Sequence, residues 1–184
     1  NSDGTGVLAG LTQICNVHGY VINEGEKQPV DGELTFRGVN IRDLVHACNE
    51  EQRFGYEEVA YLLLFGSLPD KKQLEFFKMV LSQARALPTD FIQDMVIKAP
   101  SKDIMNKMGR SILALYSYDD FADENTLEGE LKKALYTIAR MPVIMVNSYQ
   151  AKIGHYDNAS TYYHPLRPEE SMAESILSTL RPTR

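Results

Sequence analysis

Histidines and cysteines are the residues of this chain that could bind a metal or transfer a proton. Cys15 and His18 are three residues apart, but within a strand-like run their side chains would point to opposite faces. No two histidines are separated by three or four residues, so no predicted helix can present a histidine pair to a metal. The sequence therefore predicts no metal site at the four histidines, which are His18, His46, His155 and His164.

An acidic run, "DDFADENTLEGE" from Asp119 to Glu130, has the composition of a calcium loop. Such a loop needs a glycine at its sixth position, where the backbone turns sharply. No aspartate of the run meets this requirement, because the sixth positions counted from Asp119, Asp120 and Asp123 are Glu124, Asn125 and Glu128. We expect a solvated connector that also begins a helix.

Phosphate-binding and nucleophile motifs are missing from the 184 residues. The chain contains no G-x-x-x-x-G-K-[ST] and no G-x-S-x-G string. The lead-in "DGTGVLAG" has Ala9 where G-x-G-x-x-G needs its third glycine, so we expect a flexible segment there. From residue chemistry alone, we assign no catalytic, cofactor-binding or metal-binding residue.

Charge and cysteine content narrow the class of protein. The net charge of −6 argues against nucleic acid or an anionic membrane as the partner, since either needs a basic face. The longest apolar run, Met141 to Val146, is far below the roughly 18 residues of a membrane span. Cys15 and Cys48 are the only cysteines, which suggests a reducing compartment. No charged-then-apolar signal segment begins the chain, and we expect a cytoplasmic protein.

Strand patterns occupy the first forty residues. Leu11 to Asn23 is rich in β-branched and aromatic residues and predicts one or two short strands. Asp31-Gly32 reads as a turn, and Glu33 to Phe36 alternates like another strand. Gly38 is expected to turn the backbone from this strand into a helix that begins near Ile41. We predict a small antiparallel sheet.

Helical patterns fill the remainder, so the fold class is mainly α. Tyr56–Phe65 has acids in its first turn and Gly66 as its left-handed C-cap. Asp70 and Gln73 form a capping box for a helix that stops before Pro88. A shorter helix is expected over residues 89–97.

Three further helices are predicted after residue 100. Residues 101–118 carry two adjacent apolar stripes, which indicates burial on a wide face. Residues 127–153 form a long helix that Pro142 should kink or break. After the loop "GHYDNASTYYHPLRP", Pro168 suits the first turn of a last helix that ends at Leu180.

Five strings of this chain resemble, in order, segments of the citrate synthase family. "DGELTFRGVNIRDLV" and "FGYEEVAYLLLFGSLP" resemble its D-G-x-L-x-[YF]-R-G strand and the helix that follows. "APSKDIMNKMGRSILALYSYD", "ALYTIARMPVIMVNSYQAKIG" and "RPEESMAESILSTLRP" resemble its next three helices, including the internal proline. The lead-in and the loop before the last helix look closest to the clostridial form. Ser175-Ile176 and Asp103-Ile104 depart from the common residues at packing positions.

The resemblance implies a fold and an activity. Citrate synthases are mainly helical homodimers with a large and a small domain, and they condense acetyl-CoA with oxaloacetate to give citrate and CoA. Their oxaloacetate-binding histidine, catalytic histidine and aspartate lie in strings that do not occur in residues 1–184, so no family site residue is carried over. The chain is expected to bind no cofactor; acetyl-CoA would be a substrate of the parent enzyme.

We therefore expect the N-terminal part of a bacterial citrate synthase large domain, with residues 1–40 as a β-containing lead-in and 41–184 as a helical body. The small domain and the C-terminal half are expected to be missing. The fragment should be inactive and should dimerise through helices 101–118 and 127–153. A 2-methylcitrate synthase that uses propionyl-CoA, and a non-catalytic helical dimerisation module, remain alternatives.

Overall fold

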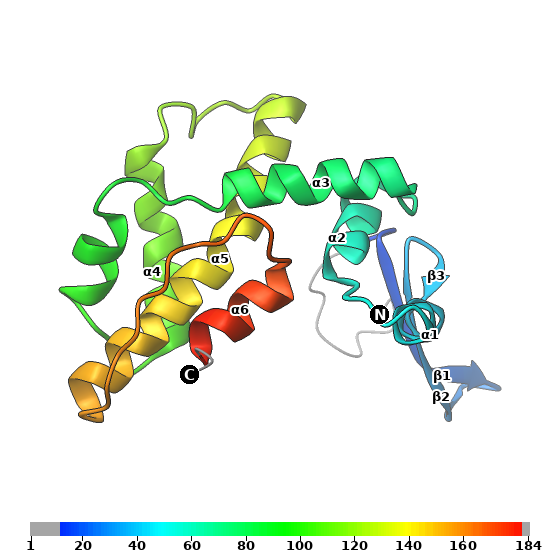
Figure 1. Cartoon of the computed structure of the whole chain (residues 1–184). Coiled ribbons are helices and arrows are strands. Elements are labelled where there is room, and N and C mark those ends of the chain that lie inside the picture. The colour runs from blue at the N-terminus through cyan, green and yellow to red at the C-terminus, as the bar shows by residue number, and fades with distance from the viewer. Residues whose placement is uncertain (1–11, 182–184) are drawn as a thin grey trace. The chain divides into compact units, whose positions relative to one another are not determined.

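The computed structural model describes residues 12–181 and is mainly helical, with one small antiparallel sheet near its start (Figure 1). This confirms the predicted fold class. The residues group into two units, 1–74 and 75–184, whose boundary falls inside a helix. The first unit holds β1 (Cys15–Asn23), β2 (Glu26–Phe36), β3 (Val39–Asn40), α1 (Ile41–Glu50) and α2 (Tyr56–Phe65), and α3 (Lys71–Ala84) crosses the boundary.

The second unit contains the remaining helices. They are the π-helix η1 (Ile92–Ile97), α4 (Ile104–Leu115), the short 3₁₀ helix η2 (Tyr116–Tyr118), α5 (Leu127–Tyr156) and α6 (Met172–Leu180). Helix α5 packs against η1, α4 and α6. The segment after α5 doubles back along that helix before α6 begins (Figure 1).

A long hairpin replaces the short strands expected near the N-terminus. β1 and β2 pair antiparallel from Cys15 opposite Phe36 to Asn23 opposite Glu26. The turn lies at Glu24 and Gly25, whose φ angles of 51° and 84° are those of a two-residue hairpin turn. The prediction that Asp31-Gly32 forms a turn is therefore wrong: this dipeptide lies within β2, where the pairing register shifts.

Arg37 and Gly38 form a second two-residue turn. Their φ angles are 49° and 84°, and they join β2 to β3, with Phe36 opposite Val39. Gly38 thus turns one strand into another, and not a strand into a helix as predicted. Helix α1 begins only after Asn40, whose side chain accepts a hydrogen bond from the Arg42 backbone N–H at 2.9 Å.

The predicted helix caps around α2 and α3 are confirmed. Helix α2 ends at Gly66, which adopts the left-handed conformation with φ 86°. Asp70 and Gln73 exchange two hydrogen bonds of 2.8 Å, each side chain accepting from the other residue's backbone N–H. Both caps depend on residues that are close in sequence.

Three helix starts differ from the predictions. The segment predicted as a helix over 89–97 forms a turn and then the π-helix η1. Helix α4 begins at Ile104, because Asp103 accepts a hydrogen bond from the Asn106 N–H at 2.9 Å and caps it there. Helix α6 begins at Met172 and not at Pro168, because Ser171 and Glu174 form a capping box.

Helix α5 is continuous for 30 residues, so the predicted break at Pro142 does not occur. Proline has no N–H for the Ile138 carbonyl, which costs about 3 kcal/mol in a helix interior. Ala139 and Ile144, on either side of Pro142, are both 0% exposed. Their packing offsets the missing hydrogen bond.

The fully buried side chains of α4 are polar, and its apolar side chains differ in burial. Lys107 and Ser111 are buried, whereas Met105 is 76% and Leu113 77% exposed. Of the two predicted apolar stripes, the one with Ile104, Met108, Ile112 and Leu115 is half-buried, whereas the one with Met105 and Tyr116 is exposed, so the predicted wide buried face is found only in part. The core of this unit comes instead from α3, η1, α5 and α6, through Phe77, Leu81, Phe91, Val96, Ala139, Ile144, Val146 and Met172.

Candidate functional site

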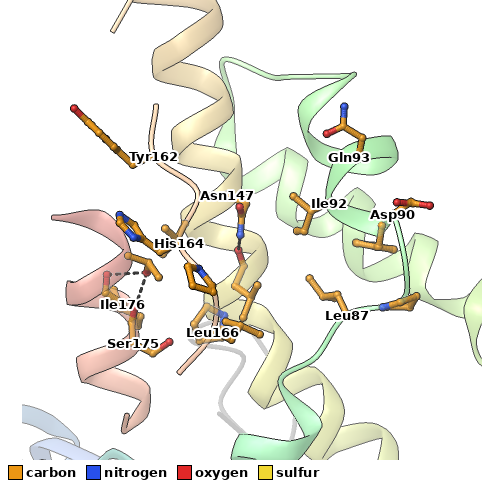
Figure 2. Close-up of a pocket in the computed structure, with 17 residues that line it drawn as sticks. Leu87, Asp90, Ile92, Gln93, Asn147, Tyr162, His164, Leu166, Ser175 and Ile176 are labelled. Carbon is orange, nitrogen blue, oxygen red and sulfur yellow. Dashed lines mark hydrogen bonds between the residues drawn. The ribbon is translucent and has the colours of Figure 1, made fainter. Parts of the chain in front are cut away.

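A pocket of about 350 Å³ lies in the second unit, between the start of η1, the middle of α5, the loop before α6, and α6 itself (Figure 2). This volume is near the lower end of the range for small-molecule sites. Apolar side chains form most of the wall, among them Leu87, Ile92, Val143, Leu166 and Ile176. The pocket combines residues up to 92 positions apart, from Leu87 to Thr179.

Local backbone structure positions the first wall of the pocket. Phe91 is fully buried and anchors the start of η1, with its ring 5.4 Å from that of Tyr118. The preceding residue, Asp90, has φ 61°, an uncommon conformation for a residue other than glycine. π-Helical turns occur often at functional sites. The turn at Asp90 and the π-helix together set the Asp90 and Gln93 side chains along the pocket wall.

The loop before α6 is held against α5 by two local contacts. The Tyr162 N–H donates a hydrogen bond to the Gln150 Oε1 at 3.2 Å. Gly154 allows Thr161 to approach closely, since a Cβ at this glycine would lie 2.4 Å from the Thr161 Cγ2. These two contacts hold the loop part of the pocket wall, residues 162–166, against α5.

His164 is the one histidine that lines the pocket. Its ring stacks on Tyr162, with centroids 6.4 Å apart and planes inclined by 16°. The His164 Nε2 is buried and has no hydrogen-bond partner within residues 12–181. A buried imidazole nitrogen with unused capacity is available to a ligand.

No lysine or arginine side chain lines this pocket, and Asp90 is the one residue with a carboxyl side chain in its lining. Anionic ligands are bound in proteins by arginine, lysine or helix N-termini. The pocket therefore lacks the charge that an anionic substrate requires.

The remaining histidines lie on three different elements. His18 is on β1, and His155 is near the end of α5 with its ring against Tyr156. His46 on α1 lies 3.3 Å from Glu50, with both side chains about 70% exposed. Within the described part of the chain, no three metal-binding side chains come together. The glycine-containing lead-in, residues 3–10, lies outside the described residues.

Lys133 of α5 binds the acidic connector between η2 and α5. Its Nζ donates to the carbonyl oxygens of Ala122 and Glu124, at 3.1 and 2.9 Å, and to the Glu130 carboxylate at 2.7 Å. Thr126 caps α5 by accepting from the Gly129 N–H at 3.1 Å. The run is a connector that begins a helix, as predicted.

The two cysteines are free thiols. Cys15 is exposed on β1. Cys48 is half-buried, with its Sγ 3.7 Å from the Arg53 Nη1. Neither thiol belongs to a cluster of metal-binding groups in residues 12–181.

No motif or periodicity in the sequence indicates this pocket. Two local features of the sequence contribute to the pocket: the proline inside α5 and the Tyr-Tyr-His-Pro string before α6. Both were interpreted as packing or loop features.

None of the helices among residues 12–181 has the length and apolar character needed to cross a membrane.

Comparison with known proteins identifies the class to which this helical domain belongs. The family model "Citrate synthase, C-terminal domain" matches residues 4–184. Citrate synthase of Saccharolobus solfataricus is 30% identical over 164 residues, which cover 89% of this chain and 39% of that protein. 2-Methylcitrate synthase of Shewanella oneidensis is 31% identical over 109 residues, or 57% of this chain and 27% of that protein.

The chain belongs to the citrate synthase family. Its fold resembles the crystal structure of citrate synthase from Pyrobaculum aerophilum, with a TM-score of 0.73, 22% identity, and coverage of 95% of this chain and 40% of that one. It also resembles citrate synthase from Thermoplasma acidophilum in complex with carboxymethyl coenzyme A and oxaloacetate, with a TM-score of 0.69, 22% identity, and coverage of 95% and 40%. The chain spans about two fifths of the length of these relatives.

Proposed function

We propose that this chain is part of an acyltransferase that condenses acetyl-CoA with oxaloacetate and water to give citrate and CoA, at the entry to the tricarboxylic acid cycle. The observation that carries the proposal is the family match over residues 4–184. The Thermoplasma relative, whose structure holds a coenzyme A analogue with oxaloacetate, supports the same substrates.

The 184-residue chain by itself should be inactive. CoA and oxaloacetate are both anionic, and the pocket beside α5 presents one carboxylate and no cationic side chain. The histidine-containing strings that carry the chemistry in the family do not occur in the sequence. This chain therefore supplies scaffold for a reaction whose acid–base groups lie on other residues of the whole enzyme.

The test is release of CoA from acetyl-CoA and oxaloacetate, followed with a thiol reagent. The pure 184-residue chain should give no release above the rate without protein. Turnover by this chain would contradict its proposed role as a scaffold.

A 2-methylcitrate synthase that uses propionyl-CoA is the second candidate. The Shewanella relative is as similar in sequence as the Saccharolobus enzyme, although over a shorter segment. Comparing kcat/KM of the complete protein with acetyl-CoA and propionyl-CoA distinguishes the two. Lack of turnover with either would favour the third reading, a non-catalytic helical dimerisation module.

Dimerisation through α4 and α5 is part of the proposal. Met105 and Leu113 of α4 are exposed, and a groove of about 430 Å³ lies between α4, α5 and the end of α6, lined by Met105, Met108, Met145 and Tyr149 among others. Exposed apolar patches of this kind are typical of protein interfaces.

Sedimentation equilibrium should find a dimer that Leu113→Asp converts to a monomer. Leu177→Asp on α6 is the matched control, since Leu177 is also an exposed helical leucine. A monomer at high concentration, or equal effects of both variants, would contradict this interface.

The cytoplasmic, bacterial location stays a prediction.

A further inference from the structure

Three methionine side chains converge on the groove between α4, α5 and the end of α6. Met105 and Met108 come from α4 and Met145 comes from α5, and the rest of the lining is apolar apart from Tyr149 and Arg181. The chain has seven methionines, so nearly half of them line this one groove. Methionine is over-represented at binding surfaces that adapt their packing to a partner.

Solvent exposure separates Met105 from the other methionines. Met105 is 76% exposed, compared with 47% for Met79 on α3 and 2% for Met172 on α6. Met108 and Met145 are half-buried. Oxidation of methionine follows the access of the oxidant to the sulfur, so Met105 is the methionine that a peroxide in solution reaches first.

Oxidation of this side chain is a balanced two-electron step. A hydroperoxide transfers one oxygen atom to the thioether sulfur of Met105. The sulfur is oxidised to a sulfoxide, the O–O bond breaks, and the hydroperoxide is reduced to the corresponding alcohol, or to water in the case of hydrogen peroxide. The product is a polar side chain with a hydrogen-bond acceptor where an apolar one stood.

A sulfoxide in this groove opposes the packing of two apolar surfaces. Its oxygen binds water, and association through α4 and α5 removes that water. Burying a polar group without replacing its hydrogen bonds is costly enough to weaken association about tenfold. Tyr149 and Arg181, the two side-chain donors of the lining, are both exposed, so a hydrogen bond from either leaves the sulfoxide hydrated.

We propose that Met105 is a reversible oxidation site, through which a hydroperoxide controls the association of two copies of this chain by α4 and α5. The inference rests on the dimer proposed above. In that dimer the groove is covered, so the oxidant acts on the free chain and prevents it from pairing again. Methionine sulfoxide reductases reverse the change, one enzyme for each sulfoxide epimer.

The first test relates oxidation to oligomeric state. The full 184-residue chain carries Cys15→Ser and Cys48→Ser, because its free thiols also react with hydrogen peroxide. Peptide mass spectrometry should find Met105 oxidised at least about tenfold faster than the buried Met172. Sedimentation equilibrium should show the dimer dissociation constant raised about tenfold, and the two reductases together should restore it.

Protein concentration gives a second measurement. At a concentration about ten times the dissociation constant, oxidation of Met105 should be about fivefold slower than in the dilute chain, because most copies are paired. In the monomeric Leu113→Asp variant, the rate at Met105 should not depend on concentration. Met79 is the control within the same molecule, since it lies on α3 and does not line the groove. Its oxidation rate should not change with concentration in either protein.

Substitutions reproduce or remove the effect. Met105→Gln places a polar amide in the groove and should weaken the dimer about tenfold without peroxide, whereas Met79→Gln should leave it unchanged. Met105→Leu keeps an apolar side chain of similar volume. It should remain dimeric after the peroxide treatment that oxidises Met105 in the parent chain. Both positions are exposed, so these replacements leave the core intact.

Three results would overturn the proposal while leaving the dimer in place. They are a dimer that persists with Met105 fully oxidised, an unweakened dimer in Met105→Gln, and a Met105→Leu chain that still dissociates after peroxide. A chain that is monomeric at high concentration before any oxidation would instead contradict the interface on which the proposal depends. The untreated protein therefore distinguishes failure of this inference from failure of the proposed dimer.

Discussion

The Arg37 guanidinium donates two hydrogen bonds to the carbonyl oxygen of Leu63, from Nε at 3.2 Å and from Nη2 at 2.9 Å. Leu63 lies in the last turn of α2, where carbonyl groups have no partner within the helix. Arg37 itself sits in the tight turn between β2 and β3. One side chain therefore connects the sheet to the end of a helix 26 residues further along the chain.

Replacing this arginine should destabilise the first unit. In Arg37→Ala, the half-buried Leu63 carbonyl loses both donors, and the expected cost is about 1–2 kcal/mol in free energy of unfolding. Arg37→Lys should recover only part of this, because an ammonium lacks the rigid fork of the guanidinium. Urea unfolding measures both, and equal stability of wild type and Arg37→Ala would contradict the assigned role.

Substitution of Gly66 should destabilise the protein through its backbone conformation alone. A Cβ at this position meets no atom within 4 Å, so space does not oppose a side chain. The φ of 86° opposes a side chain, because residues other than glycine rarely adopt it. Gly66→Ala should therefore lower the free energy of unfolding by about 1 kcal/mol. Gly66→Asn should cost less, since asparagine tolerates this conformation. Thermal unfolding of the two variants should rank them in that order.

Acid should weaken the start of α6 through Glu174. Hydrogen bonds from the Ser171 backbone N–H, and then from its side chain, hold the pKa of the Glu174 carboxyl below its usual range. A lowered pKa in the folded state adds stability above the unfolded value of about 4.3, and this stability disappears as pH falls through the folded value.

Glu174→Gln removes that pH dependence. The difference in free energy of unfolding between wild type and this variant should be constant from pH 7 to 5 and should shrink below about pH 4. Hydrogen exchange of the α6 amides measures it locally. A difference that stays constant down to pH 2 would show that the Ser171–Glu174 cap does not depend on the carboxylate charge.

Lys107 should give a pH dependence of the same sign as Glu174, but at alkaline pH. Its side chain is only 3% exposed, and its Nζ donates to the Ala99 carbonyl at 2.8 Å. Burial, with a smaller effect of Arg110, lowers the pKa of the Lys107 ammonium. Between that lowered value and the unfolded value of about 10.4, the unfolded chain binds more protons, so stability rises with pH.

Lys107→Met tests this contribution. Relative to this variant, the wild type should gain free energy of unfolding as the pH rises toward about 10. Lys102→Met, at an exposed lysine just before α4, is the control and should show no such gain. Parallel pH curves for wild type and Lys107→Met would contradict a desolvated ammonium at this position.

Features encoded by neighbouring residues could be predicted from the sequence. The Asp70–Gln73 box, the Gly66 cap and the limits of α2 each depend on interactions within four residues, and all three were predicted correctly. The same local reading placed a turn at Asp31-Gly32, but the hairpin turns at Glu24-Gly25. Both dipeptides have residues suited to a tight turn, and pairing of β2 along the whole of β1 decides which of them forms the turn.

Tertiary packing decided the remaining features. Proline inside a helix predicts a break, yet α5 continues because Ala139 and Ile144 are buried around it. The two apolar stripes of α4 predict burial, yet the chain by itself leaves the stripe with Met105 and Tyr116 exposed. The sequence by itself determined the family, the helical class and the local caps. Only the tertiary structure brings Asp90, Asn147 and His164 around one pocket, because they lie up to 74 positions apart and no short-range interaction relates them.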